Sequence, residues 1–247
     1  MALFEAQGLH MRFGHRVVLE DISLAVDEGD LAGIMGPNGA GKTTCFNVLT
    51  GRYRPTRGRV TFAGEDITGL APHVIARKGV ARSFQLMNLF NDFTARENVA
   101  VALPAMRARG FNVARDATAD PALRAAANTV LERVGLAGKG EVIAKNLSYG
   151  DRRALEIGVA LAASPRVLFL DEPTSGLGSE ATARLAALVR SLKGAITMVV
   201  IEHDMAFLFG LADRISVIHW GQVIARGTPA ELRANPWVRA SNLGKLA

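Results

Sequence analysis

The sequence predicts an α/β fold: a mostly parallel sheet with an N-terminal antiparallel β part and an inserted α-helical lobe. Three observations support this prediction. Residues 3–26 alternate between apolar and polar side chains, which is typical of half-buried antiparallel strands. Residues 88–164 are rich in alanine and show helical periodicity. After residue 164, short apolar runs alternate with helical stretches, which indicates parallel strands joined by crossover helices.

The expected elements follow in chain order. Before the lobe we expect a helix at 43–49 and strands at 3–6, 17–19, 22–26, 31–35 and 59–62. Within the lobe, glycines separate helices expected at 95–101, 121–134 and 152–162. After the lobe we expect helices at 179–192 and 205–212 and strands at 167–170, 196–201 and 214–219. The chain is therefore expected to be a single domain, 1–247, with a core of 1–87 and 165–247 and a lobe of 88–164.

The composition is that of a globular protein with one sizeable core. The 247 residues are 49% hydrophobic and 21% charged. No apolar run approaches the roughly 18 residues that a membrane-spanning helix needs, and the N-terminus shows no signal-peptide pattern. Cys45 is the only cysteine, so no intrachain disulfide can form, and we expect its thiol to be buried. These features favour a cytoplasmic location.

The net charge of +6 leaves three interpretations open: nucleic-acid binding, work beside an anionic membrane, and solubility alone. The arginines are scattered along the chain, and no aromatic residues are interleaved with them in a nucleic-acid-binding pattern. The charge pattern therefore does not favour a nucleic-acid partner.

A glycine-rich loop between the strand at 31–35 and the helix at 43–49 has the pattern G-x-x-x-x-G-K-[ST]. Its residues are Gly36, Pro37, Asn38, Gly39, Ala40, Gly41, Lys42 and Thr43, and Thr44 follows. Glycines allow successive backbone N–H groups to surround phosphate oxygens, the lysine can reach the β- and γ-phosphates, and the threonine hydroxyl can ligate Mg²⁺. The alternative is a glycine-rich turn with a stray lysine. The strand before the loop and the helix after it favour a nucleotide-phosphate site.

Two acids, Asp171 and Glu172, follow the apolar strand at 167–170. They fall at the carboxyl end of a buried strand, where open α/β sheets bind ligands. Asp171 would hold Mg²⁺, directly or through water, and Glu172 would orient or activate a water in line with the γ-phosphate. The alternative is two surface carboxylates at a strand end. The phosphate loop upstream favours the nucleotide role.

The segment Leu147-Ser148-Tyr149-Gly150 stands shortly ahead of the acidic strand. Ser148 is suited to cap a helix, and Asp151 follows in capping-box spacing, so a structural role alone would explain the segment. The three motifs in this order, however, resemble those of ATP-binding cassette (ABC) ATPases, whose core has the P-loop NTPase fold. In that family this helix start contacts the γ-phosphate of ATP bound to the other subunit. The resemblance implies that Ser148 and Gly150 act in trans.

Three further residues match positions of the family. Gln85 matches a glutamine that touches Mg²⁺ and the attacking water, His203 a histidine that contacts the γ-phosphate, and Phe13 an aromatic residue that stacks on adenine. Each has an ordinary alternative: a polar loop residue, a structural histidine and a hydrophobic residue at a strand end. The resemblance implies that the catalytic residues are Lys42, Gln85, Glu172 and His203 and that the metal ligands are Thr43, Gln85 and Asp171.

The resemblance narrows to one branch, the ATPase subunits of branched-chain amino acid ABC importers. Phe46-Asn47, residues 82–85 and Ile201-Glu202-His203-Asp204-Met205 carry it. It implies ATP and Mg²⁺ as ligands and a second ABC ATPase subunit, identical or paralogous, as partner. It also implies membrane permeases, an indirect periplasmic solute-binding protein, no nucleic acid, and a place at the cytoplasmic face of the inner membrane. The apolar segment 86–90 is the expected permease contact, with a place in the core of the lobe as the alternative.

Two residues depart from the family pattern. Gly178 stands where Asp or Asn is common, and Asp151 stands where Gln is common. The rival interpretation is a soluble ABC ATPase that acts on nucleic acid or ribosomes. Such proteins usually carry two cassettes or a long coiled-coil insertion, and this chain has neither.

Overall fold

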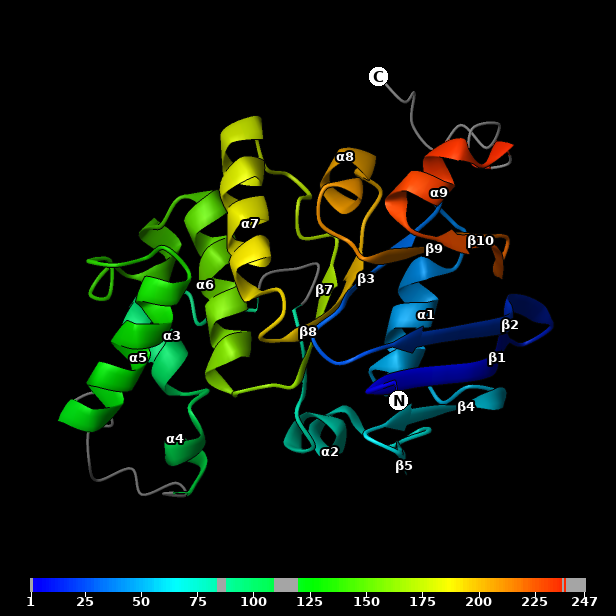
Figure 1. Cartoon of the computed structure of the whole chain (residues 1–247). Helices are drawn as coiled ribbons and strands as arrows, with labels where there is room; N and C mark the ends of the chain where they lie inside the picture. Colours follow the sequence, from blue (N-terminus) through cyan, green and yellow to red (C-terminus); the bar gives the residue numbers. More distant parts are fainter. Residues whose placement is uncertain (1, 84–87, 109–119, 237, 239–247) are drawn as a thin grey trace.

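The computed structural model describes residues 2–83, 88–108, 120–236 and 238. These residues form an antiparallel sheet and a larger, mostly parallel sheet (Figure 1). The antiparallel sheet lies on one side of the parallel sheet. Helices α3 (Ala95–Ala100), α4 (Pro104–Ala108), α5 (Pro121–Arg133) and α6 (Tyr149–Ala162) lie on the other. The predicted fold class is confirmed.

The antiparallel sheet is built around one long hairpin. Its strand order is β2 (Arg16–Val26), β1 (Phe4–Phe13), β4 (Arg57–Phe62) and β5 (Glu65–Asp66). The sequence predicts three short strands where the structure has the continuous β1 and β2. The pairing of β1 with β2 shifts register between Ala6 and Leu9 and again on either side of Met11. Such irregularities interrupt the apolar alternation, so one hairpin reads as separate runs.

The second sheet is parallel except at one edge. Its order is β10 (Gln222–Gly227), β9 (Arg214–His219), β3 (Leu31–Met35), β8 (Thr197–Ile201), β7 (Val167–Asp171) and β6 (Val80–Arg82). Only β10 runs antiparallel to its neighbour. The sequence predicts β3, β7, β8 and β9 but misses both edge strands. β6 has three residues, and β10 is largely exposed, so neither has the apolar run that marks a buried strand.

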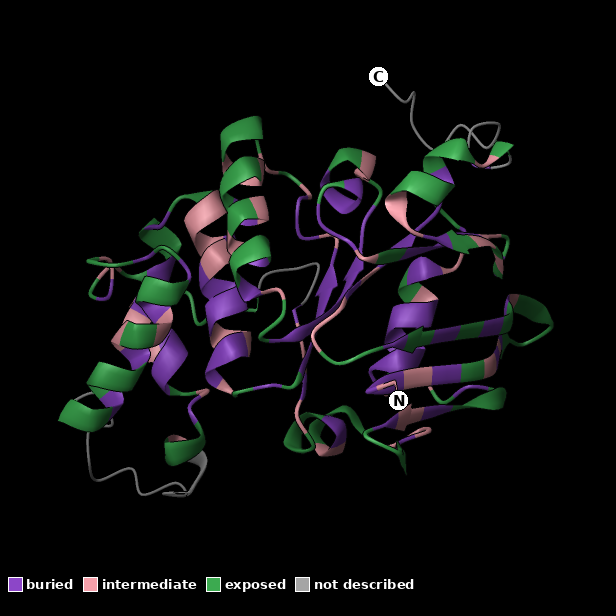
Figure 2. Ribbon diagram, viewed as in Figure 1, coloured by how far each residue is buried: buried purple, intermediate pink, exposed green. Residues whose placement is uncertain are grey.

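Alternate residues of the parallel strands face two separate apolar cores, which Figure 2 shows as buried ribbon on both sides of the sheet. In β7, Val167 and Phe169 pack with the antiparallel sheet and α1 (Lys42–Leu49). Leu168 and Leu170 pack with the helices on the other face. Because both faces of β7 are packed in this way, its position in the sheet is fixed. The position of Asp171 and Glu172 at its carboxyl end is fixed with it.

The remaining helices are α2 (Pro72–Arg77), α3 (Ala95–Ala100), α4 (Pro104–Ala108), α5 (Pro121–Arg133), α6 (Tyr149–Ala162), α7 (Ser179–Leu192), α8 (Met205–Phe209) and α9 (Pro229–Ala234). The predictions of α3, α5 and α7 are confirmed. α6 begins three residues earlier than predicted, since Ser148 is its N-cap, and α8 ends earlier, at Phe209, with Gly210 as its C-cap. The short helices α2, α4 and α9 are not predicted, although each begins at a proline, which favours the first turn of a helix.

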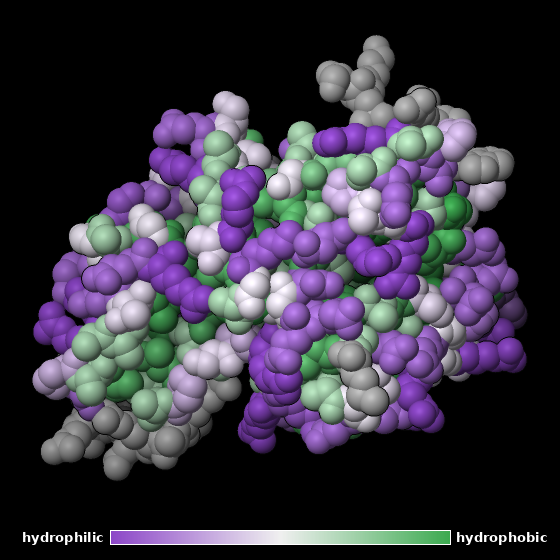
Figure 3. All heavy atoms as spheres, in the orientation of Figure 1, coloured by the Kyte–Doolittle hydropathy of each residue, from purple (hydrophilic) through white to green (hydrophobic). Residues whose placement is uncertain are grey.

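Cys45 is fully buried in α1, as predicted, and burial raises the pKa of its thiol to about 12. Hydrophilic residues surround smaller hydrophobic patches on the face drawn in Figure 3. No helix in the described part of the chain combines the length and the apolar character needed to cross a bilayer. The division into a core and a lobe at residue 88 stays a prediction, because this boundary adjoins residues 84–87, outside the described chain.

Candidate functional site

The phosphate loop is held in place by close backbone contacts that only glycine permits. A Cβ atom on Gly36 would lie 2.1 Å from the carbonyl oxygen of Ile218 in β9. Gly41 has a φ of 103°, in the left-handed region, and a Cβ there would lie 2.9 Å from the carbonyl oxygen of Val18 in β2. The loop is therefore wedged between the two sheets, which fixes its path before any ligand binds.

The start of α1 leaves backbone donors free for an anion. Its N-cap, Gly41, provides no side-chain cap, and the N–H of Cys45 is the first to return to the helix, at 2.8 Å from the Gly41 carbonyl oxygen. The N–H groups of residues 42–44 therefore have no acceptor within the helix. Free donors at the positive end of a helix form an anion site, which fits a nucleotide phosphate.

Lys42 is folded back over the loop. Its Nζ donates hydrogen bonds to the carbonyl oxygens of Gly36 and Pro37, at 2.8 and 3.1 Å. Burial lowers the pKa of this ammonium, although Glu172, Asp171 and Glu202 act in the opposite direction. The cation is thus already desolvated and held by weak neutral acceptors, an arrangement that a phosphate anion would improve.

One cavity of about 420 Å³ brings together three features that are predicted to bind ATP: Phe13, the phosphate loop and Glu172. It is lined by Phe13, Arg16, Val18, Asn38, Gly39, Gly41, Lys42, Thr43, Thr44 and Glu172. Phe13 is 45% exposed, and its ring meets that of Tyr53 edge to face, with centroids 5.3 Å apart. The partly exposed ring of Phe13 suits the base of a nucleotide, and Lys42 in the same cavity suits its phosphates. Arg16 and Val18 are not predicted, because β2 reaches the loop only through the fold.

Asp171 ends β7 as a nearly buried carboxylate, 3% exposed. Burial, and then the charge of Glu172, raise its pKa to about 6, and Arg82 and Lys42 only partly offset this. A divalent cation would stabilise both carboxylates and reverse the shift. The donor set of Asp171 and the Thr43 hydroxyl is oxygen only, which suits Mg²⁺.

Glu172 adopts a left-handed backbone conformation, with a φ of 45°. Such a conformation costs a residue other than glycine on the order of 1 kcal/mol or more, and it turns the side chain away from the strand direction. Its Oε1 lies 4.0 Å from Nδ1 of His203, which follows β8 and is 55% exposed. The structure therefore brings these two predicted residues together, although 31 positions separate them in the sequence.

The start of α6 is built differently. The Ser148 hydroxyl caps the helix by accepting from the N–H of Asp151 at 3.1 Å. The second half of the expected capping box is replaced by an ion pair: the Asp151 carboxylate binds Lys139, at 2.7 Å. Burial raises the pKa of this carboxyl, but the hydrogen bonds from Lys139 and Ser148 outweigh it, and the pKa lies below its usual value.

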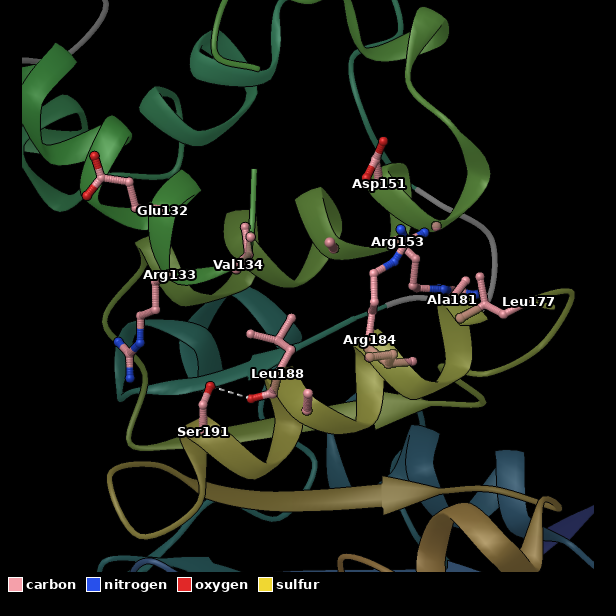
Figure 4. Close-up of a pocket in the computed structure, with 15 residues that line it drawn as sticks. Glu132, Arg133, Val134, Asp151, Arg153, Leu177, Ala181, Arg184, Leu188 and Ser191 are labelled. Carbon is pink, nitrogen blue, oxygen red and sulfur yellow. Dashed lines mark hydrogen bonds between the residues drawn. The ribbon is translucent and has the colours of Figure 1, made fainter. Parts of the chain in front are cut away.

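Ser148 and Gly150 do not line the cavity that contains Phe13 and Glu172. Gly150 instead borders a second cavity, of about 360 Å³, between α6 and α7, which Figure 4 shows with Asp151, Arg153 and Arg184 around it. Tyr149 reaches across to the segment after Glu172, donating its hydroxyl proton to the carbonyl oxygen of Ser175 at 3.2 Å. Gln85 lies outside the described residues, so its predicted place near the metal stays a prediction.

A third cavity, of about 330 Å³, lies between the parallel sheet and the helices that precede β7. Its walls come from α2 and β6, including His73 and Val80, and from α6 and the turn after α3, including Val159 and Ala102. Its lining is mostly apolar, and none of its lining residues also lines the cavity at the phosphate loop.

Comparison with known proteins gives consistent results. The family model described as "ABC transporter" matches residues 19–175. The chain is 41% identical to the high-affinity branched-chain amino acid transport ATP-binding proteins LivG of Salmonella typhimurium and BraF of Pseudomonas aeruginosa, with 98% of each chain covered. It is 33% identical to the lipopolysaccharide export system ATP-binding protein LptB of Acidithiobacillus ferridurans, over 98% of this chain and 97% of the relative.

Solved structures agree with this. The ADP conformation of MJ1267, an ATP-binding cassette of an ABC transporter, superposes with a TM-score of 0.87 at 28% identity, covering 99% of this chain and 100% of that one. The dimeric post-hydrolysis state of the cassette MJ0796, bound to ADP and Pi, superposes with a TM-score of 0.76 at 25% identity, covering 92% and 98%.

Proposed function

This chain belongs to the ABC transporter family, and we propose that it is the ATP-hydrolysing subunit of an importer for branched-chain amino acids or related small solutes. The observation that supports this proposal most strongly is the single cavity in which Phe13, the phosphate loop and Glu172 meet, with the buried Asp171 next to Glu172. The similarity to LivG and BraF along nearly the whole chain supports the class of solute.

Residues of the cavity, together with Asp171, Gln85 and His203, have separate proposed roles in ATP hydrolysis. Phe13 stacks on the adenine, and the free N–H groups at the start of α1, with Lys42, bind the phosphates. Thr43 and Asp171, with Gln85, would hold Mg²⁺, which when bound neutralises charge that develops on the phosphates. Glu172 accepts the proton of the attacking water, and His203, 4.0 Å from it, contacts the γ-phosphate.

We propose that each site is completed by a second, identical or paralogous subunit. Ser148 and Gly150 lie outside the cavity of their own chain, which supports a role at the nucleotide of the other subunit. The dimer of MJ0796 with ADP and Pi shows that a cassette of this fold forms dimers. A C2 arrangement would place each α6 start over the phosphate loop of its partner.

Membrane permeases are the proposed partners to which the conformational change driven by ATP hydrolysis is passed. The apolar cavity between α2 and α6 is suited to a short permease helix. Of the segment 86–90, Leu86 and Met87 lie outside the described residues, and Leu89 packs partly against the core. Phe90 is 56% exposed and stacks on Phe93, with ring centroids 4.9 Å apart. This aromatic pair is therefore a better candidate than Leu89 for a second permease contact, in addition to the cavity.

Binding to permeases would place the subunit at the cytoplasmic face of the inner membrane. A periplasmic solute-binding protein would then be an indirect partner. The net charge of +6 would favour a position beside the anionic membrane surface. Nucleic acid is not a proposed partner, because the basic residues form no stripe with interleaved aromatic residues.

The test compares ATPase rate and solute uptake in proteoliposomes that contain the permease. Phe90→Ser combined with Phe93→Ser should leave ATP affinity within about twofold of the wild type but uncouple uptake from hydrolysis, because the apolar contact that is lost involves no residue of the nucleotide cavity. Ile224→Ser, at an exposed apolar residue of β10, is the matched control. Stimulation of turnover by DNA or RNA at physiological salt, without stimulation by the permease, would contradict the transporter function.

A further inference from the structure

Glu202, directly after β8, has a fully buried side chain. A buried carboxylate is costly unless hydrogen bonds satisfy it. Here each oxygen is satisfied by a different segment. Oε1 accepts hydrogen bonds from the backbone N–H and the hydroxyl of Thr174, at 2.7 and 2.6 Å. Oε2 accepts from the N–H groups of His203 and Asp204, at 3.1 and 3.4 Å.

The Thr174 bonds fix the loop that carries Glu172. The backbone N–H of Glu172 donates to the carbonyl oxygen of Ile201 at 2.8 Å, and its own carbonyl accepts from Ser175 at 3.1 Å. The loop is therefore attached to the end of β8 twice, at Ile201 and at Glu202. A residue with a side chain keeps a left-handed conformation only where its surroundings enforce it, and these two attachments enforce the φ of 45° at Glu172.

The other oxygen fixes the segment that carries His203. The imidazole of His203 is 55% exposed, so packing alone does not orient it. The hydrogen bonds from the N–H groups of His203 and Asp204 determine where the ring leaves the backbone. The same carboxylate thus sets the position of both groups that face each other at 4.0 Å, Glu172 and His203.

We propose that Glu202 is a positioning residue for ATP hydrolysis, which holds Glu172 and His203 in one arrangement without touching the nucleotide. The inference rests on the roles proposed above for those two residues. Glu202 does not line the nucleotide cavity, and of the three acids that help to keep Lys42 charged it contributes least, so its loss should affect turnover far more than binding. A displacement of about 1 Å in a catalytic group can lower the rate on the order of 10²-fold.

The central variant is Glu202→Gln. The amide keeps an oxygen for Thr174 but turns an NH₂ group toward the N–H groups of His203 and Asp204, so donor faces donor. We expect kcat to fall about 10- to 100-fold while the Kd for ATP stays within about twofold. Glu65→Gln, which removes an exposed carboxylate in β5, is the control for charge.

Two further comparisons separate positioning from loss of structure. Thr174→Val removes the hydroxyl at nearly constant volume and should lower kcat, and Thr174→Ser should recover most of that loss. If Glu202 acts through His203, adding Glu202→Gln to His203→Ala should lower kcat by less than the product of the two single effects. The readouts are phosphate release, ATP binding by calorimetry and the melting temperature.

The inference is overturned if Glu202→Gln and Thr174→Val turn over ATP within about twofold of the wild type, or if ATP affinity falls as much as kcat. It is also overturned if the two losses simply multiply in the double variant. Glu172→Gln separates the two levels of the argument. If that variant is inactive while Glu202→Gln is normal, only the Glu202 inference fails. If Glu172→Gln is itself active, the proposed role of Glu172 fails.

Discussion

The starts of α1 and α6 are both predicted to contact ATP phosphates, yet they are built in opposite ways. α1 begins at Gly41, which offers no cap, and it leaves the N–H groups of its first turn free. α6 begins at Ser148, whose hydroxyl already accepts one N–H, and it carries an acid in its first turn. Since free donors and positive potential attract phosphate, α1 can bind an anion alone and α6 is far less suited to do so.

The difference suggests how the site is divided between subunits. On the proposed division, affinity for ATP would reside in the chain that contributes Phe13, Lys42 and the start of α1, which meet in one cavity. The start of α6 would contribute only when a nucleotide is already bound opposite it. Closure of the dimer would then depend on the γ-phosphate that both helices share, so that hydrolysis weakens the interface.

The largest effect is expected from Glu172→Gln, which alters the chemistry of the α1 side and leaves its phosphate contacts intact. Loss of a group that activates the attacking water should lower kcat about 10²- to 10⁴-fold at nearly unchanged ATP affinity. Because ATP then persists, the variant should accumulate as an ATP-bound dimer in size-exclusion chromatography. A kcat within about twofold of the wild type would exclude this role.

A mixing experiment tests the division itself. Lys42→Ala chains lack the α1 side, and Ser148→Arg chains carry a bulky cation at the α6 start, so each alone should be inactive. A mixed dimer has one site with both sides intact. An equal mixture should therefore recover up to about a quarter of wild-type activity, since about half of the dimers are mixed and each has one working site. The readout is phosphate release as the ratio of the two chains is varied.

The proposed division of the site between two subunits would be contradicted if a strictly monomeric preparation hydrolysed ATP at the full rate. It would also be contradicted if the mixture of the two variants were as inactive as each variant alone while both variants still dimerised. In either case Ser148 and Gly150 would have no part in the site of the other chain.

The sequence predicts the two sides of the site unequally well. The phosphate loop, Asp171 and Glu172 are predictable because each occupies a fixed distance from a buried strand, and the structure brings Phe13, Lys42 and Glu172 to one cavity. Arg16, Thr174 and Glu202 are not predicted, because their places depend on which strands become neighbours. β8 lies between β3 and β7, and only this order sets Glu202 against Thr174. The charge partner of Asp151 is also missed, because Lys139 lies 12 positions away, in a loop before α6.

The smallest expected effect concerns the acid that distinguishes α6. Asp151 favours the positive start of its helix and pairs with Lys139. Asp151→Asn should therefore lower the free energy of unfolding by about 0.3–1 kcal/mol near neutral pH. Asp92→Asn removes an ion pair of the same length, with Lys145, in which both side chains are mostly exposed, and it should cost less.

The pH dependence gives this prediction a sign. The pKa of Asp151 lies below its usual value in the folded protein, because the hydrogen bonds from Lys139 and Ser148 outweigh burial. A depressed pKa stabilises the folded state above the unfolded pKa of about 4, and the stabilisation is lost as the pH falls through the folded pKa. In urea unfolding, the deficit of Asp151→Asn should be constant between about pH 7 and 5 and shrink below about pH 4. A deficit that grew on acidification would mean that the carboxylate destabilises the start of α6, and the contrast with α1 would then rest on the Ser148 cap alone.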